Sequence, residues 1–311
     1  MKRLSSLYRK HFWIITFAFF SLSVQAQSSL DLFTISGRFG PSQTAGEPLE
    51  GENKELGMLV NLKVPVVLSE RSIFYSELSY FNSHVESDQS LPTDVMNPVN
   101  LHGFILQTGL VQTLNDKQKL QLLLVPRFMT DFENISSANW QWGGVALFEN
   151  RYSNKLMMRF GIMYNTEMFG PAVNPLIYID WQIAPKWSIS GMLPIFAKVK
   201  YQANDNLSVG LSHFGLVTSY RLGNMAYADD YIERTSIDLT LFARQRIAGN
   251  LHVEGRVGYA LGRKYIQYAQ DQKVDFRVMI FSFGDDRVLK NQMMKTGPIA
   301  NLRLVYNLPL E

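Results

Sequence analysis

Charged side chains recur at every second position in several parts of the sequence. Arg244 and Arg246 are two residues apart, and so are His252, Glu254 and Arg256. Side chains two positions apart in a β-strand lie on the same face, so this spacing would gather charge on one face of neighbouring strands. Such a face can attract an anionic solute, or its opposite charges can pair with one another across strands. The spacing leaves both possibilities open.

Other charged residues share this alternation in their own segments. The candidates for a polar, solute-facing surface are Lys63, Arg127, Arg159, Asp238, Arg244, Arg246, His252, Glu254, Arg256 and Arg303. The same parity also carries Arg38, Glu77, Glu149, Asp180, Lys198 and Lys200. Because both signs are present, mutual pairing fits the pattern as well as solute binding does.

Residues for hydrolytic or metal chemistry are scattered. His213 lies on an apolar parity, but no serine follows it at the His-x-Ser spacing that barrel phospholipases show. The acidic pairs Asp229-Asp230 and Asp285-Asp286 have no histidine near them in sequence. Neither an HExxH motif nor a glycine-rich phosphate loop is present. We therefore expect no catalytic residue, no cofactor and no metal site.

Composition excludes several classes of protein. The 311-residue chain is 46% hydrophobic and 13% aromatic, so intrinsic disorder is not expected. Its mean hydropathy of −0.06 is too polar for a bundle of transmembrane helices. Because it has no cysteine, it has no disulfide, no thiolate metal site and no lipid-bearing cysteine.

Residues 1–26 are predicted to be a secretory signal peptide. Residues 1–11 contain four basic and no acidic side chains, an apolar run follows at 12–24, and cleavage is expected after Ala26. The apolar run is shorter than the ~17 residues of a spanning helix, which disfavours an uncleaved anchor. Loss of this segment turns the formal net charge of +3 into −1, so we expect no nucleic-acid binding.

The remaining chain, 27–311, alternates apolar and polar side chains with a period of two. In 55–67 every even-numbered residue from Leu56 to Val66 is apolar, while the odd-numbered ones include Glu55 and Lys63. This pattern predicts strands with one apolar and one polar face. The predicted strands are 31–39, 55–67, 71–82, 101–114, 118–130, 139–149, 154–165, 175–183, 186–193, 195–203, 206–220, 231–247, 250–262 and 298–308.

Alternation fits either a soluble sandwich or a membrane barrel with its apolar face toward lipid. Four features favour the barrel: strands long enough to cross a bilayer, a signal peptide, aromatic residues at strand ends, and tight turns that alternate with longer links. The longer links are expected near 40–54, 83–100, 131–138, 166–174 and 221–230. The fold class is therefore an all-β, antiparallel up-and-down barrel of about 14 strands, with 12 or 16 possible. The alternating segment 273–283 is assigned to an excursion, since counting it would give an odd number.

Three hairpin segments carry a resemblance to a known family. They are 187–194 (WSISGMLP), 198–201 (KVKY) and 206–211 (NLSVGL). Together with the signal peptide, they resemble the uncharacterised outer-membrane β-barrel proteins of Gram-negative bacteria, which carry a domain of unknown function. The resemblance implies location in the outer membrane, with membrane lipid and the barrel-assembly machinery as partners. The end of the chain (NLPLE) departs from the aromatic terminus of such barrels, and Tyr306 would take that role.

These observations lead to three functional hypotheses. The first is a passive pore or small-solute transporter, without enzymatic activity. The second is a closed structural barrel whose loops at 83–100 and 263–297 bind surface partners. A barrel hydrolase that uses His213 is the least favoured.

Overall fold

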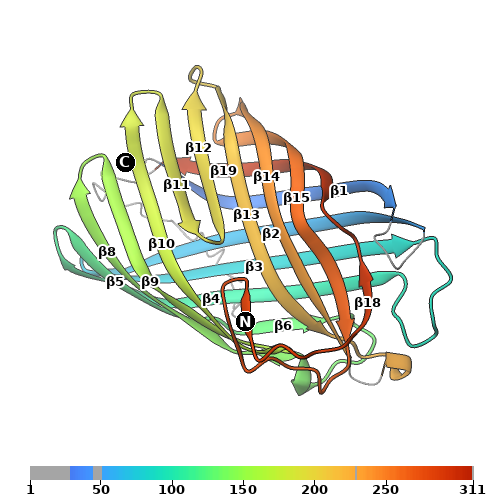
Figure 1. Ribbon diagram of the computed structural model, residues 1–311. Helices are drawn as coiled ribbons and strands as arrows, with labels where there is room; N and C mark the ends of the chain where they lie inside the picture. Colours follow the sequence, from blue (N-terminus) through green and yellow to red (C-terminus); the bar gives the residue numbers. More distant parts are fainter. Residues whose placement is uncertain (1–28, 45–50, 228–229, 310–311) are drawn as a thin grey trace, which may run out of the picture.

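The computed structural model describes residues 29–44, 51–227 and 230–309, which form an almost purely β-structure (Figure 1). The strands are β1 (Ser29–Thr44), β2 (Glu52–Ser69), β3 (Ser72–Ser87), β4 (Val99–Asn115), β5 (Gln118–Leu124), β6 (Arg127–Thr130), β7 (Trp140–Gln141), β8 (Gly143–Ser153), β9 (Leu156–Glu167), β10 (Gly170–Ala184), β11 (Trp187–Leu193), β12 (Phe196–Gln202), β13 (Leu207–Arg221), β14 (Tyr231–Ala248), β15 (Leu251–Tyr268), β16 (Phe276–Val278), β17 (Phe281–Phe283), β18 (Leu289–Met293) and β19 (Gly297–Pro309). The two short 3₁₀ helices are η1 (Ser137–Asn139) and η2 (Met225–Tyr227). A helix able to cross a bilayer is absent from the part of the chain that the structure describes. The predicted signal peptide lies outside the described residues.

The described strands close into one antiparallel barrel of 14 strands, because β1 pairs with both β2 and β19. β5 with β6, and β7 with β8, each make one barrel strand. Pro126 interrupts the first of these since it has no N–H, but its carbonyl still accepts the N–H of Leu106 at 3.0 Å. The prediction of about 14 strands is confirmed, as is the transmembrane β-barrel class.

The barrel exposes its apolar side chains and buries its charges. Leu56, Met58 and Leu62 of β2 are between 39% and 50% exposed on the outer face, whereas Glu55 is fully buried. A soluble sheet would show the opposite arrangement, with its apolar face inward. The outer face therefore suits a hydrocarbon environment.

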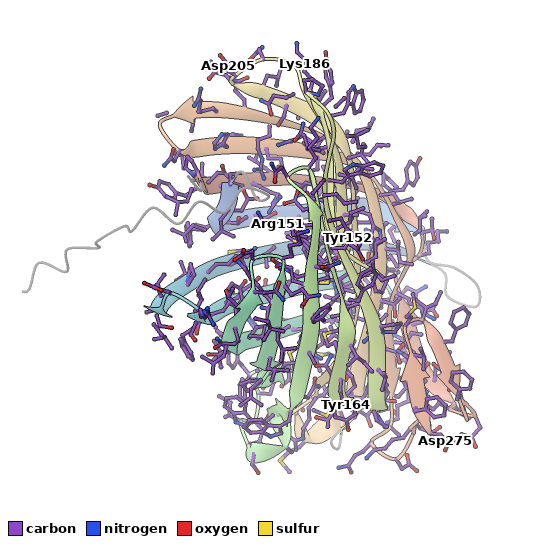
Figure 2. The ribbon with its side chains drawn as sticks, turned by 90° about the vertical axis from the view of Figure 1, so that its left-hand side faces the viewer. Arg151, Tyr152, Tyr164, Lys186, Asp205 and Asp275 are labelled. Carbon is purple, nitrogen blue, oxygen red and sulfur yellow. The ribbon has the colours of Figure 1, made fainter. Side chains whose placement is uncertain are left out.

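Connections of two lengths define the two rims. Tight turns at 70–71, 116–117, 154–155, 185–186, 203–206 and 249–250 make the short-turn rim, and longer links make the long-loop rim. Figure 2 shows Lys186 and Asp205 at the short-turn rim and Tyr164 and Asp275 at the other. Trp187 packs on Tyr201 near the first rim, with 5.0 Å between ring centroids. Aromatic residues near the rims are typical of membrane barrels.

One expected long link was wrong. In place of a loop over 166–174, only Met168 and Phe169 separate β9 from β10. The turn is tight because Gly170 adopts a φ of +124°, which side-chain-bearing residues rarely adopt. Pro171 falls in the predicted link and Pro175 at the start of the predicted strand, and both lie within β10.

The wall is incomplete beside β10. β11 and β12 have seven residues each, so they pair only with the part of β10 from Ile177 and the part of β13 up to Phe214. On the long-loop side of the β11–β12 turn, β10 pairs instead with β16, in parallel. β16 and β17 form a hairpin in the link between β15 and β19 (Figure 1). The excursion predicted at 273–283 is thus confirmed.

The barrel interior is packed shut toward the long-loop rim. Leu101 of β4 and Met129 of β6 share a buried cluster with Tyr220, Ile232 and Tyr265 from β13, β14 and β15. A second cluster joins Phe169 and Ala172 to Tyr231, Ile266, Tyr268 and Val274. Since β4 and β6 stand opposite β13 to β15 in the strand order, these side chains bridge the interior from wall to wall.

Candidate functional site

The lumen between this packed end and the short-turn rim holds a cavity of about 1920 Å³. Its lining begins at Ser29, Asn250 and Pro309, which lie at the ends of strands on the short-turn rim. From there the lining continues toward the packed end, past both charged and apolar residues. A chamber of this size exceeds the ~300–1,000 Å³ typical of small-molecule pockets.

Glu254 on β15 is the centre of a cationic cluster in this lumen. Its carboxylate accepts hydrogen bonds from Arg256 and Arg303 at 2.6 Å on Oε1, and from Arg244 at 2.6 Å and Lys198 at 2.8 Å on Oε2. Four strands supply these groups, since Lys198 lies on β12, Arg244 on β14, Arg256 on β15 and Arg303 on β19. Arg244 and Arg303 are the register partners of Glu254 on its two neighbouring strands. One carboxylate therefore forms ion pairs with four cationic side chains.

Asp31 on β1 completes this cluster. Both of its oxygens bind Arg244, at 2.9 and 2.8 Å, and Asn307 donates to Oδ1 at 2.7 Å. With Asp31 included, two carboxylates face four cations, and Lys200 adds another positive charge to the cavity lining. The cationic belt (Lys198, Lys200, Arg244, Arg256 and Arg303) thus keeps an excess of positive charge toward the lumen.

A second ion cluster lies nearer the packed end. Glu55 accepts hydrogen bonds from Arg38 at 2.9 Å, Arg263 at 2.8 Å and the Tyr265 hydroxyl at 2.8 Å. Arg38 also pairs with Asp238. Arg234 lies 3.7 Å from the Glu55 carboxylate, so three arginines and two carboxylates are packed together here. Each of these side chains is at most 11% exposed, so this layer is fixed polar packing rather than a free charged surface.

Beside it, Arg127 of β6 binds Glu167 at the end of β9 and the Thr218 hydroxyl of β13. The other Glu167 oxygen accepts from the backbone N–H and the hydroxyl of Ser219, at 2.9 and 2.7 Å. These contacts tie β13 to the opposite wall.

An apolar patch lies on the wall opposite the cationic belt, although Lys119, Glu149, Arg151 and Arg159 of the same wall also line the cavity. Val125, Val145 and Leu176 are buried in one cluster, against which Ile105, Met163, Met192 and Ile195 pack. All seven also line the cavity. The lumen therefore offers the cationic belt and an apolar patch to the same occupant.

Comparison with known proteins identifies the family. A family model described as a domain of unknown function (DUF6268) matches residues 56–306. The chain belongs to the DUF6268 family. A search of curated proteins gave no match.

Solved structures similar to this DUF6268 chain include two from Pseudomonas putida. The COG4313 outer membrane channel from P. putida F1 is 13% identical, with 89% of this chain and 94% of that chain covered and a TM-score of 0.43. The P. putida toluene transporter TodX is 9% identical, with 89% of each chain covered and a TM-score of 0.41. Values this low imply nothing about the solute of the DUF6268 chain.

The structure brings most of the predicted polar residues of the DUF6268 barrel to the cavity. The lining includes Lys63, Arg127, Arg159, Asp238, Arg244, Arg256 and Arg303. Glu254 is buried beneath the cations that it binds. His252 and Arg246 do not line the cavity: His252 contacts the carbonyl of Asn250, and the Nε of Arg246 donates to the Asn206 side chain at 2.9 Å near the short-turn rim.

Several residues of these clusters were not among the candidates. Asp31 was not predicted to face the lumen, because a bulge between Asp31 and Phe33 reverses the alternation of inward and outward side chains. Counting by two from Arg38 therefore passes over Asp31. In β15 the inward residues are even-numbered through Ala260 and odd-numbered from Arg263, because a bulge and Gly262, with a φ of +56°, intervene. Glu55 was visible on the polar parity of its strand and could have been included.

His213 has a structural contact. Its Nε2 lies 2.7 Å from the carbonyl oxygen of Pro194 in the turn between β11 and β12. Within the described ranges, no group of three or more His, Asp or Glu side chains is arranged to hold a metal ion.

Proposed function

We propose that this chain is an outer-membrane transport protein whose lumen takes up a small solute by its negatively charged group. The cationic belt is the observation that carries this proposal, because its positive charges outnumber the two carboxylates that they bind. Guanidinium groups present five donors in a rigid fork, so arginines that already hold Glu254 retain donors for a solute anion. The lumen then acts as a binding chamber.

The packed long-loop end makes a permanently open pore a poor description of this chamber. The same packing is what the second candidate function, a closed structural barrel, would require. The chamber of about 1920 Å³ favours transport, because a purely structural barrel needs no space of that size. A transport measurement separates the two.

The proposal also assigns an orientation and a location. Tight turns face the periplasm and long loops face outward in barrels of this kind. The cavity would then open toward the periplasm. Export requires the predicted signal peptide, so N-terminal sequencing of the protein from an outer-membrane fraction should begin at Gln27.

The test uses the full mature chain in proteoliposomes. Octanesulfonate is a suitable probe because it keeps its charge and does not cross lipid in a neutral form. We expect uptake above that of protein-free vesicles, and no uptake of octyltrimethylammonium, which has the same chain and the opposite charge. Arg303→Gln should reduce uptake, whereas Arg71→Gln, in an exposed turn, should not. Equal uptake of both probes, or none of either, would refute the proposal.

A further inference from the structure

The barrel wall has a gap on one side, between the halves of β10 and β13 that lie nearer the long-loop rim. β13 from Leu216 to Arg221 pairs with β14, and β10 from Gly170 to Leu176 pairs with β9. The short β11–β12 hairpin ends before it reaches either segment. Its last contact with β13 is a hydrogen bond from the Gly215 N–H to the Ile195 carbonyl at 2.7 Å. Between these two half-strands the regular sheet is interrupted.

Two prolines prevent another β-strand from filling the gap in full register. The carbonyl of Val173 points toward the gap, since it accepts the Met279 N–H at 3.3 Å. Backbone groups of alternate residues point to the same side of a strand, so Pro171 and Pro175 face the gap as well. Neither has an N–H to donate. The sequence therefore keeps this edge of β10 poorly suited to a permanent partner.

The β16–β17 hairpin occupies the gap. It pairs with β10 at only two positions, Ala172 with Arg277 and Val173 with Val278. Among the residues that the structure describes, no backbone pairing joins β17 to β13. In Figure 1 the hairpin rises in red toward the turn between β11 and β12. Among the described strands, the backbone of the hairpin is therefore paired with the barrel wall along one edge only.

The side chains of the hairpin follow the two faces of the wall. Phe276 and Phe283 are exposed and stack on each other with ring centroids 4.5 Å apart. Arg277 is buried and donates to the Ser282 hydroxyl at 2.9 Å. The hairpin thus continues the apolar exterior and the polar interior of the barrel.

The cavity lining extends to the edges of this gap. Its lining includes Pro194, Ile195, Phe196, Phe214, Ile280 and Phe281. Ile280 is 58% exposed and Phe281 63% exposed, although both line the cavity. Apolar side chains therefore line the gap between the chamber and the outer face of the wall, whereas the long-loop end is packed.

We propose that solute enters or leaves the chamber sideways, between β10 and β13, when the β16–β17 hairpin moves, and that the solute is an amphiphilic anion. This rests on the proposed function. The cationic belt holds the charged group, the apolar patch around Val145 and Leu176 holds the chain, and the gap exchanges the chain with the membrane. A solute without an apolar part would gain nothing from such a route.

The experiment fixes the hairpin to the wall by a disulfide. Val173 and Val278 are register partners on neighbouring strands, at a spacing that a disulfide can bridge, and the chain has no other cysteine. The double variant Val173→Cys/Val278→Cys is compared with Phe276→Cys/Phe283→Cys, whose disulfide closes the hairpin on itself without fixing it to β10. Mass spectrometry verifies both bridges.

We expect oxidation of the first variant to slow octanesulfonate uptake by about tenfold, with recovery after reduction. The second variant should keep the rate of the unmodified protein in both redox states. Unchanged uptake through a verified Val173–Val278 bridge would overturn the lateral route while leaving the transport function intact. Uptake of methanesulfonate, which has no chain, as fast as octanesulfonate and independent of the bridge would overturn it too. Absence of uptake in the unmodified protein would instead refute transport itself.

Discussion

Both terminal nitrogens of Arg277 bind the carboxylate of Glu233, at 3.0 and 3.1 Å, across 44 positions of sequence. Arg277 belongs to the β16–β17 hairpin, and Glu233 belongs to β14. Arg287 binds the same carboxylate at 2.8 Å, and the Arg277 guanidinium lies 4.0 Å from the centre of the Phe169 ring. The buried Glu233 thus holds the link between β15 and β19 against the barrel through two arginines, one before β17 in the sequence and one after it.

Glu233→Gln should loosen the hairpin. The change leaves the buried Arg277 without its carboxylate and Arg287 with only that of Asp285, and breaking a buried ion pair typically costs about 3–5 kcal/mol. We expect faster hydrogen exchange of the amides in 276–283 and faster octanesulfonate uptake. The control is Glu86→Gln, because its pair with Lys54 at 3.0 Å is half exposed. Exchange as slow as in the unmodified protein would show that Glu233 does not hold the hairpin.

Glu254→Gln should destabilise the barrel and make it dependent on added anions. Four cations would then face one another with only Asp31 to offset them, again at a cost of about 3–5 kcal/mol. A gel-shift assay of heat unfolding in detergent measures this loss. Octanesulfonate should raise the unfolding temperature of the variant more than that of the unmodified protein, since it supplies the missing charge. An equal rise in both would argue against an anion site at the cationic belt.

Leu241→Arg tests which face meets lipid. Leu241 on β14 is 61% exposed, and its register neighbours Leu211 and Val257 are 57% and 60% exposed. An arginine near the middle of a bilayer costs about 2–4 kcal/mol. The same change on a water-facing surface usually stays within about 0.5 kcal/mol. Unfolding of Leu241→Arg and Leu241→Ala in vesicles, measured side by side, separates charge from lost side-chain volume.

The contact between Arg287 and Asp285, in the link after the hairpin, should be lost only in strong acid. Arg287 donates to both oxygens of Asp285, at 2.8 and 2.9 Å, and this hydrogen bonding lowers the pKa of Asp285 below its ordinary value of 3.8. A lowered carboxyl pKa contributes stability above the ordinary value and loses it as pH falls through the folded-state value. Carboxyl NMR should therefore show Asp285 ionised between about pH 7 and pH 5 and titrating below 3.8. Titration above 3.8 would contradict the contact.

Alternation in sequence was enough to predict the barrel because lipid and lumen impose opposite chemistry on successive side chains. The proline at 194 also separated β11 from β12 correctly. Alternation failed where the backbone changes its own period, as at the bulge after Asp31 and at Gly262. A bulge depends on pairing with a distant strand, which a local pattern does not contain.

The site was predictable only in part for a related reason. Arg256 and Arg303 follow the period of two and could be placed on the inner face from the sequence. The parallel pairing of β16 with β10 joins residues about one hundred positions apart, and it leaves no mark on the hydrophobic period. The gap in the wall becomes visible only when the lengths of β11 and β12 are compared with those of β10 and β13.

The first and last strands pair with each other from Ser29 beside Pro309 to Phe39 beside Ala300. The seam that closes the cylinder thus needs strands from opposite ends of the barrel sequence. A folding intermediate without this seam exposes two unpaired strand edges, which favour aggregation. Truncation by a few C-terminal residues should therefore harm assembly far more than loss of the same number from a surface loop.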